Sequence, residues 1–262
     1  PLFKPPVVRS KEALASQGGP SPRPAVEPCF LGFGLVIALS TSASLFTGAS
    51  PALSALPSLG WLTNTVRVVV FLACALIVGG GHRLPARTRL GWVAGICATI
   101  GIATSLIAPL AGGGTMAVNT AGVAVMAVGH ALLYLLWLEL YARMDLPHVL
   151  MYFSLVHLVS AALSFVLSLV SAAWFVVITL VALPLASSWL LATSIRRSSD
   201  APFMQGETPR AGWSFPIKPV VLLASFTFAN SFVRHFLTVD LRGMALLGVI
   251  AAACLVLALQ PI

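Results

Sequence analysis

Long apolar runs without charge alternate with short polar stretches along most of the chain. Two of these runs, Leu90–Leu138 and Leu146–Ile195, contain no Asp, Glu, Lys or Arg. A membrane-spanning helix needs about 20 apolar residues, so each run is long enough for two. A water-soluble domain of this size would instead carry charged side chains over its surface. The pattern therefore predicts an all-α fold, a polytopic transmembrane helical bundle.

Turn-forming residues divide the apolar runs into eight predicted helices. The stretch Ala111–Gly114 interrupts the first uncharged run, and Ser171 with its neighbours interrupts the second. The expected helices are Phe30–Ala49, Leu62–Gly81, Leu90–Leu110, Met116–Leu140, Val149–Leu169, Ala173–Ile195, Pro219–Phe236 and Leu241–Leu259.

Polar stretches divide the chain into four expected parts. Residues 1–28, rich in Pro, Ser and Gly, are expected to form a disordered cytoplasmic tail, followed by a six-helix membrane bundle over residues 29–195. Residues 196–218 form the expected cytoplasmic linker, and residues 219–262 the first two helices of a second membrane half. This layout is similar to that of major facilitator proteins. The chain starts without Met and stops just after an apolar run, so we expect a fragment of a longer protein.

The distribution of basic residues predicts the orientation. Hydrophobic residues make up 58% of the chain and charged residues only 8%, with a formal net charge of +8. The basic residues lie in short clusters between apolar runs and form no basic helix of the kind that binds nucleic acid. With the N-terminus inside, most of the 15 Lys and Arg residues fall on the inner side. The positive-inside rule therefore predicts a multi-pass protein of the cytoplasmic membrane with its N-terminus inside.

The predicted helix Met116–Leu140 carries a polar and aromatic stripe. At 100° per residue, the members of this stripe fall within about 80° of one another and should face other helices or a cavity. They are Asn119, Met126, His130, Tyr134, Trp137 and Tyr141. One interpretation is a surface that lines a ligand or ion site, with Asn119, His130, Tyr134 and Trp137 as candidates. The other is hydrogen bonding between helices, with aromatic anchoring at the inner interface.

Charged residues beside or inside the apolar segments give further candidates. Arg67 either extends outward to the interface or reaches an anionic ligand, so it joins the ligand-lining candidates. Glu139 lies four residues before Arg143, a spacing that favours an ion pair at the inner mouth. A charged cluster at the expected outer turn is either an external recognition site or a self-neutralising group. Its members are Arg234, His235, Asp240 and Arg242.

Other polar and small residues favour helix packing. His157 has serines and an alanine on its side of the helix and is expected to be a hydrogen-bonded packing histidine. Gly91 and Gly95 form a GxxxG step, which is typical of close helix contacts. Pro184 should kink its helix, with a neighbouring helix compensating the disturbed backbone.

The chain contains no arrangement of residues typical of a catalytic or metal site. A nucleophile elbow, a phosphate-binding loop with lysine and a His/Glu metal spacing are all missing from the sequence. The cysteines lie too far apart in sequence for a metal knuckle or a redox pair, and three lie in apolar runs. They are Cys29, Cys74, Cys97 and Cys254. We therefore expect neither an enzyme nor a bound cofactor or metal.

Two short motifs resemble one family. Leu31–Leu35 and Trp137–Met144 look like segments of the membrane half of large LuxR-type transcriptional regulators, in which a facilitator-like helical domain precedes a DNA-binding helix-turn-helix. The resemblance implies a sensory domain that binds a small ligand within the lipid bilayer and contacts DNA only through a C-terminal region outside this chain. The alternative is a major-facilitator-type secondary transporter of a small solute. The loop Gly79–Arg89 lacks the acid that such transporters carry there, which favours the regulator.

Overall fold

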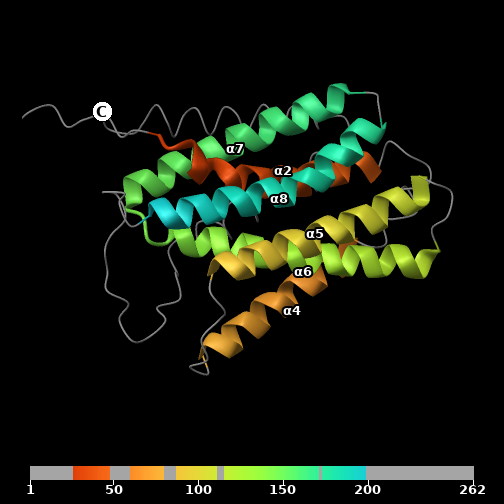
Figure 1. Cartoon of the computed structure of the whole chain (residues 1–262), viewed down its shortest axis with the longest axis horizontal. Coiled ribbons are helices and arrows are strands. Elements are labelled where there is room, and N and C mark those ends of the chain that lie inside the picture. The colour runs from red at the N-terminus through yellow and green to blue at the C-terminus, as the bar shows by residue number, and fades with distance from the viewer. Residues whose placement is uncertain (1–25, 48–59, 80–86, 111–114, 171–172, 199–262) are drawn as a thin grey trace, which may run out of the picture.

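The structure, a computed structural model, describes residues 26–47, 60–79, 87–110, 115–170 and 173–198, where every regular element is a helix (Figure 1). In chain order the elements are the 3₁₀ turn η1 (Pro28–Gly32) and the helices α2 (Phe33–Thr47), α4 (Gly60–Gly79), α5 (Arg87–Leu110), α6 (Met116–Tyr141), α7 (Leu146–Leu169) and α8 (Ala173–Arg197). The predicted all-α class is confirmed over these ranges.

The helices α2 to α8 coincide with the first six predicted segments. By length and composition, α5 to α8 are long and apolar enough to cross a membrane, while η1, α2 and α4 contribute the shorter apolar stretches Pro28–Ser40 and Leu62–Cys74. The length and composition of these helices indicate that the chain is a membrane protein. The expected tail up to residue 25, the linker after Ser198 and both helices of the second half lie outside the described residues.

Side-chain caps fix where two of the helices begin. Before α6, the Thr115 hydroxyl accepts a hydrogen bond from the backbone N–H of Val118, 3.4 Å away. Before α7, the Asp145 carboxylate accepts one from the N–H of His148 at 3.0 Å. Pro147 lies in the first turn of α7, where backbone N–H groups have no acceptor within the helix, so the missing N–H of proline costs no hydrogen bond. The cap therefore starts α7 at Leu146, before the predicted Val149, because hydropathy alone does not register capping.

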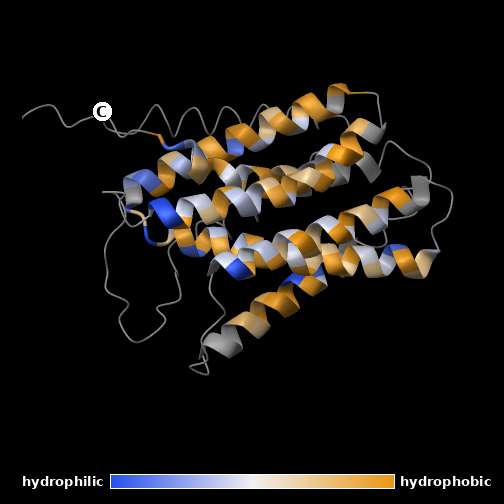
Figure 2. Cartoon of the chain, in the orientation of Figure 1, coloured by the Kyte–Doolittle hydropathy of each residue, from blue (hydrophilic) through white to orange (hydrophobic). Residues whose placement is uncertain are grey.

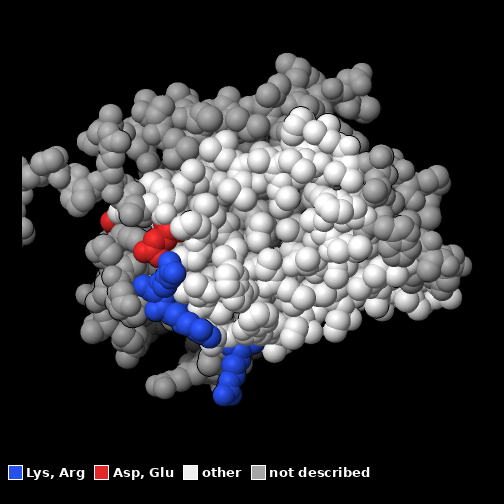
Figure 3. Space-filling view, turned by 45° about the horizontal axis from the view of Figure 1, so that its top comes forward, with Lys and Arg blue, Asp and Glu red and all other residues white. Residues whose placement is uncertain are grey.

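Charged residues gather at one end of the described bundle, which we call the charged end. Figure 2 shows hydrophilic positions concentrated where α6 and α8 end and α7 begins, and Figure 3 shows basic and acidic side chains side by side on an otherwise uncharged face. Arg67, within α4, is the exception among the described side chains. The members of the charged end are Glu27, Arg89, Glu139, Arg143, Asp145, Arg196 and Arg197.

The packing of the helices has an internal symmetry. Helix α5 packs against α6 and α8, α2 packs against α7 and α8, and α4 packs against α6 (Figure 1). If α2, α4 and α5 are exchanged with α6, α7 and α8 in order, these main pairs map onto one another, whereas the smaller contact of α6 with α8 has no comparable counterpart between α2 and α5. Helix α2 begins at the charged end, whereas α6 ends there. The two triplets of helices therefore cross the bundle in opposite directions.

Small residues bring the backbones of α5 and α6 into contact. A Cβ added at Gly101 of α5 would collide with the backbone of Met126 in α6. One added at Gly129 of α6 would collide with the backbone of Ala98 and lie 2.5 Å from the carbonyl oxygen of Ala94. Ala94 and Ala98 are themselves fully buried. Such crossings give close van der Waals contact where lipid supplies no hydrophobic driving force between helices.

The outward face of the bundle is apolar. Large hydrophobic side chains on five helices, α4 to α8, are more than half exposed. They include Val69, Leu72, Phe165, Ile178 and Trp189. In water such a surface would cause aggregation, whereas in hydrocarbon it is well solvated.

We expect Gly129→Val to destabilise the bundle by about 1–3 kcal/mol, because the added side chain has no space against α5. Thermal unfolding of the purified protein in detergent measures the effect. Ala121→Val, at an exposed position of the same helix, is the matched control and should leave the melting temperature unchanged. Equal melting temperatures for the two variants would contradict the backbone contact between α5 and α6.

Candidate functional site

A buried histidine near the middle of α6 contacts α2. His130 is 3% exposed. Its Nε2 lies 2.9 Å from the Ser40 hydroxyl oxygen and 3.0 Å from the Val36 carbonyl oxygen. Because a carbonyl only accepts hydrogen bonds, Nε2 carries the proton and donates to Val36. Nδ1 of the neutral ring is then an acceptor, and it is buried without a partner in the part of the chain that the structure describes.

An arginine of α4 reaches the same serine. Nη2 of Arg67 donates to the Ser40 hydroxyl oxygen at 3.3 Å. Its Nε is buried and has no hydrogen-bond partner among the described residues. Tyr134, one helical turn beyond His130, also lies near Arg67. Side chains from α2, α4 and α6 thus meet around Ser40, and we call Arg67, Ser40 and His130 the central polar cluster.

Each acid of the described residues is paired at the charged end, away from Arg67. Glu27 lies 3.7 Å from Arg197, and Glu139 lies 3.5 Å from Arg143. Asp145 contacts the His148 ring. An arginine within an apolar bundle carries a large desolvation cost, so an intramembrane position of this kind is a functional candidate.

Trp137 and Tyr141 lie in the tightly packed part of α6 near the charged end. Trp137 is fully buried, and its Nε1–H donates to the Ser187 hydroxyl oxygen at 2.9 Å. The Ser187 hydroxyl in turn donates to the Gly32 carbonyl oxygen at 3.0 Å. The Tyr141 hydroxyl donates to the Phe30 carbonyl oxygen at 2.6 Å. These two members of the stripe therefore hold η1 and α8 against α6.

Tyr134 and Asn119 occupy different surroundings on the same stripe. The Tyr134 ring packs edge-on against Phe33, with centroids 4.8 Å apart, and lies 5.9 Å from the His130 ring. Asn119, partly buried, lies about 16 Å from His130 towards the uncharged end of α6. Its Oδ1 is buried and unpaired. The stripe thus divides into a hydrogen-bonded packing half near the charged end and a half with unpaired polar atoms.

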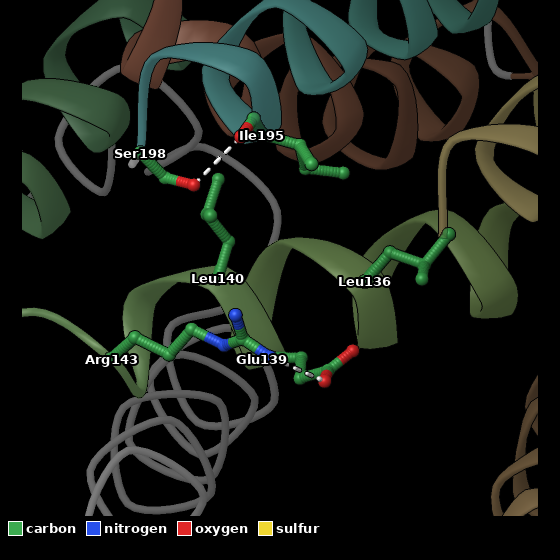
Figure 4. Close-up of a pocket in the computed structure, with 6 residues that line it drawn as sticks. All are labelled: Leu136, Glu139, Leu140, Arg143, Ile195 and Ser198. Atoms are coloured by element: carbon green, nitrogen blue, oxygen red, sulfur yellow. Dashed lines mark hydrogen bonds and ion pairs between the residues drawn. The ribbon is translucent and has the colours of Figure 1, made fainter. Parts of the chain in front are cut away.

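The predicted ion pair at the end of α6 is confirmed. Glu139 and Arg143 point towards one another from successive turns, 3.5 Å apart (Figure 4). They border a small pocket between the ends of α6 and α8, where the Ser198 hydroxyl donates to the Ile195 carbonyl oxygen. The pocket is lined by Leu136, Glu139, Leu140, Arg143, Ile195 and Ser198. Both charges are partly exposed, so the pair contributes little to stability.

Two predictions about packing are confirmed. His157 is buried, and its Nδ1–H donates to the Phe153 carbonyl oxygen at 2.8 Å. Gly91 and Gly95 face α8, and a Cβ at Gly95 would collide with Ser188. The prediction for Pro184 stays a prediction: the Thr99 hydroxyl donates to the Val181 carbonyl oxygen at 3.1 Å, whereas the carbonyl that Pro184 leaves without its usual donor is that of Leu180.

Several contacts were not predicted. Ser40 is one of several small polar residues in its segment and has no distinguishing signal in the sequence. The Glu27 backbone N–H donates to the Tyr152 hydroxyl at 3.0 Å, which ties η1 to α7. The outer-turn candidates lie outside the described residues. Among the described residues no group of three or more His, Cys, Asp and Glu side chains is placed to hold a metal ion.

Comparison with known proteins gives no assignment. No family model matches the chain, and no curated protein or solved structure matches it significantly.

We expect Ser187→Ala to lower the free energy of unfolding by about 1–3 kcal/mol, because it leaves the buried Trp137 N–H without its partner and removes the hydrogen bond to the Gly32 carbonyl oxygen. Ser194→Ala is the matched control, since Ser194 is equally buried in α8 but its hydroxyl is unpaired. Thermal unfolding in detergent should therefore show a lower melting temperature for S187A and no decrease for S194A. A similar decrease in both variants would contradict the role of Ser187.

Proposed function

We propose that this chain is the membrane-embedded sensory domain of a LuxR-type transcriptional regulator, which binds a small ligand among α2, α4 and α6. The observation that carries the proposal is the central polar cluster. Three helices direct polar groups to one point of an apolar bundle, and two of those groups keep a buried atom unpaired. Unpaired buried polar atoms are costly in the empty bundle, and a bound ligand supplies the partners they lack.

A ligand bound at this cluster would change the contacts between several helices at once. Ser40 accepts from both Arg67 and His130, so a ligand that recruits either side chain changes the contacts of α2 with α4 and α6. Helix α2 continues from η1, which Tyr141 and Tyr152 bind at the charged end. In the proposed regulator this end faces the cytoplasm, and DNA is bound by a C-terminal region outside this chain.

The orientation and membrane are part of the same proposal. Arg89, Arg143, Arg196 and Arg197 all lie at the charged end. An excess of basic residues at one end supports a cytoplasmic location for that end. Because η1 starts there, this proposal has the N-terminus on the cytoplasmic side of the cytoplasmic membrane.

A facilitator-type secondary transporter is the second candidate, and the symmetry of the helix contacts favours it. Two triplets of helices that cross a membrane in opposite directions are the building plan of inverted-repeat transporters, whose substrate sites lie near the bilayer midplane. The central polar cluster lies at such a depth, since His130 is close to the middle of α6. The two candidates share the site and differ in whether the ligand crosses the membrane.

His130→Gln in the natural, full-length protein tests both candidates. The Gln amide N–H replaces Nε2–H as donor to Val36, but its acceptor Oε1 does not take the position of Nδ1 in the ring, so we expect packing to survive and ligand response to be lost. His157→Gln, at the buried packing histidine, is the matched control. For the sensor, transcript profiles of the H130Q strain should resemble those of a strain lacking the gene, and those of H157Q should resemble the parent.

Two results would count against the sensor. If neither gene deletion nor H130Q changes any transcript, the regulator proposal fails. If H130Q abolishes depletion of a solute from the medium while transcripts stay constant, the transporter is the correct assignment.

A further inference from the structure

Unpaired polar atoms are unevenly distributed over the described residues. Four buried side-chain atoms lack a hydrogen-bond partner there: Arg67 Nε, Asn119 Oδ1, His130 Nδ1 and Ser194 Oγ. The first three belong to α4 and α6, which pack against each other. Arg67 and His130 also share Ser40 as a hydrogen-bond partner, so their unpaired atoms belong to one small region.

Among the described residues, no acid compensates the charge of this region. Arg67 is charged at any physiological pH. The described acids, Glu27, Glu139 and Asp145, each contact a basic group at the charged end. Within the described part of the chain, Arg67 has a serine hydroxyl as its hydrogen-bonding partner and an apolar bundle around it. A guanidinium in such surroundings attracts an anion, and its planar fork of donors matches the two oxygens of a carboxylate.

His130 adds a second requirement. Nε2–H is used by Val36 and Ser40, so the free Nδ1 offers a lone pair. A carboxylate has no proton to give to that lone pair. A ligand that satisfies both side chains therefore carries an anionic group for Arg67 and an O–H or N–H donor close to it for His130.

We propose that the central polar cluster binds a small carboxylate that bears a neighbouring hydrogen-bond donor, such as a 2-hydroxy acid, with Arg67 holding the carboxylate and His130 accepting from the donor. This inference rests on the proposed ligand-binding function and names its ligand class. Asn119, on the same face of α6 towards the uncharged end, presents a further unpaired polar atom on the side from which an external solute would arrive.

Fluorine NMR of the purified chain with 3,3,3-trifluorolactate tests the inference. Binding should broaden the fluorine signal of the probe. Lactate should displace the probe and restore the narrow line, whereas lactamide, which lacks the charge, should not. Propionate, which lacks the hydroxyl, should require a several-fold higher concentration than lactate.

Matched variants assign the two roles. Arg67→Gln should weaken probe binding at least about tenfold, as expected for loss of a charged hydrogen-bond partner. Arg143→Gln removes a partly exposed arginine at the charged end and should leave binding unchanged. His130→Gln should retain carboxylate binding but abolish the preference for lactate over propionate. If R67Q fails to fold, Arg67→Lys decides, because it keeps the charge and loses the planar fork, and it should also weaken binding.

The inference is overturned if the natural chain does not broaden the signal, if lactamide competes as well as lactate, or if folded R67Q or R67K binds like the natural chain. The proposed function fails separately. If H130Q loses the transcript or uptake response but the natural chain does not bind the probe, only the proposed ligand class is wrong. Probe binding without any effect of H130Q on transcripts or uptake removes the sensor and transporter roles and leaves the site.

Discussion

The hydrocarbon around this chain offers no hydrogen bonds, and the rest of the structure depends on that constraint. The backbone N–H and C=O groups satisfy it by bonding to one another in helices over most of the described residues. Polar side chains satisfy it by forming hydrogen bonds to neighbouring helices. Ser187 links Trp137 to Gly32, and the Ser188 hydroxyl donates to the Gly91 carbonyl oxygen at 2.9 Å. Two neighbouring serines of α8 thus fasten it to two different helices.

Against this background the central polar cluster stands out. Most buried polar side chains of the described bundle have partners, so the unpaired atoms of Arg67 and His130 are not a general feature of the fold. The contacts of both residues with Ser40 are already enough to hold the helices together. We propose that the remaining donor and acceptor serve to bind a small molecule. This point lies near the middle of α6, and in inverted-repeat transporters, the second candidate proposed above, ligand sites lie near the bilayer midplane.

The sequence predicted those features that depend on neighbouring residues. The helix positions follow from apolar runs and turn residues, and the pair of Glu139 with Arg143 follows from a spacing of four. Contacts between distant positions were not predictable in the same way. Ser40 and His130 are 90 positions apart, and Arg67 lies 27 positions from Ser40. Their meeting depends on which helices become neighbours, and apolar patterns do not encode this order.

The stripe on α6 shows the same limit within one helix. Helical periodicity placed Asn119, His130, Tyr134, Trp137 and Tyr141 on one face, but it did not separate their roles. Trp137 and Tyr141 hold η1 and α8 through hydrogen bonds. Asn119 and His130 keep unpaired atoms. The division arises because the helices that cover α6 differ along its length, which is a property of the tertiary structure.

The most direct test of this account is a cross-link between α2 and α6 at the depth of the cluster. In the full-length protein, with its natural cysteines replaced, Ser40→Cys and His130→Cys should be joined rapidly by a short thiol-specific reagent in native membranes, because the two natural side chains lie 2.9 Å apart. Ser40→Cys with His157→Cys is the control pair. If the first pair reacts with a membrane-permeant alkylating reagent but never cross-links, the three helices do not meet at this point and the account is wrong.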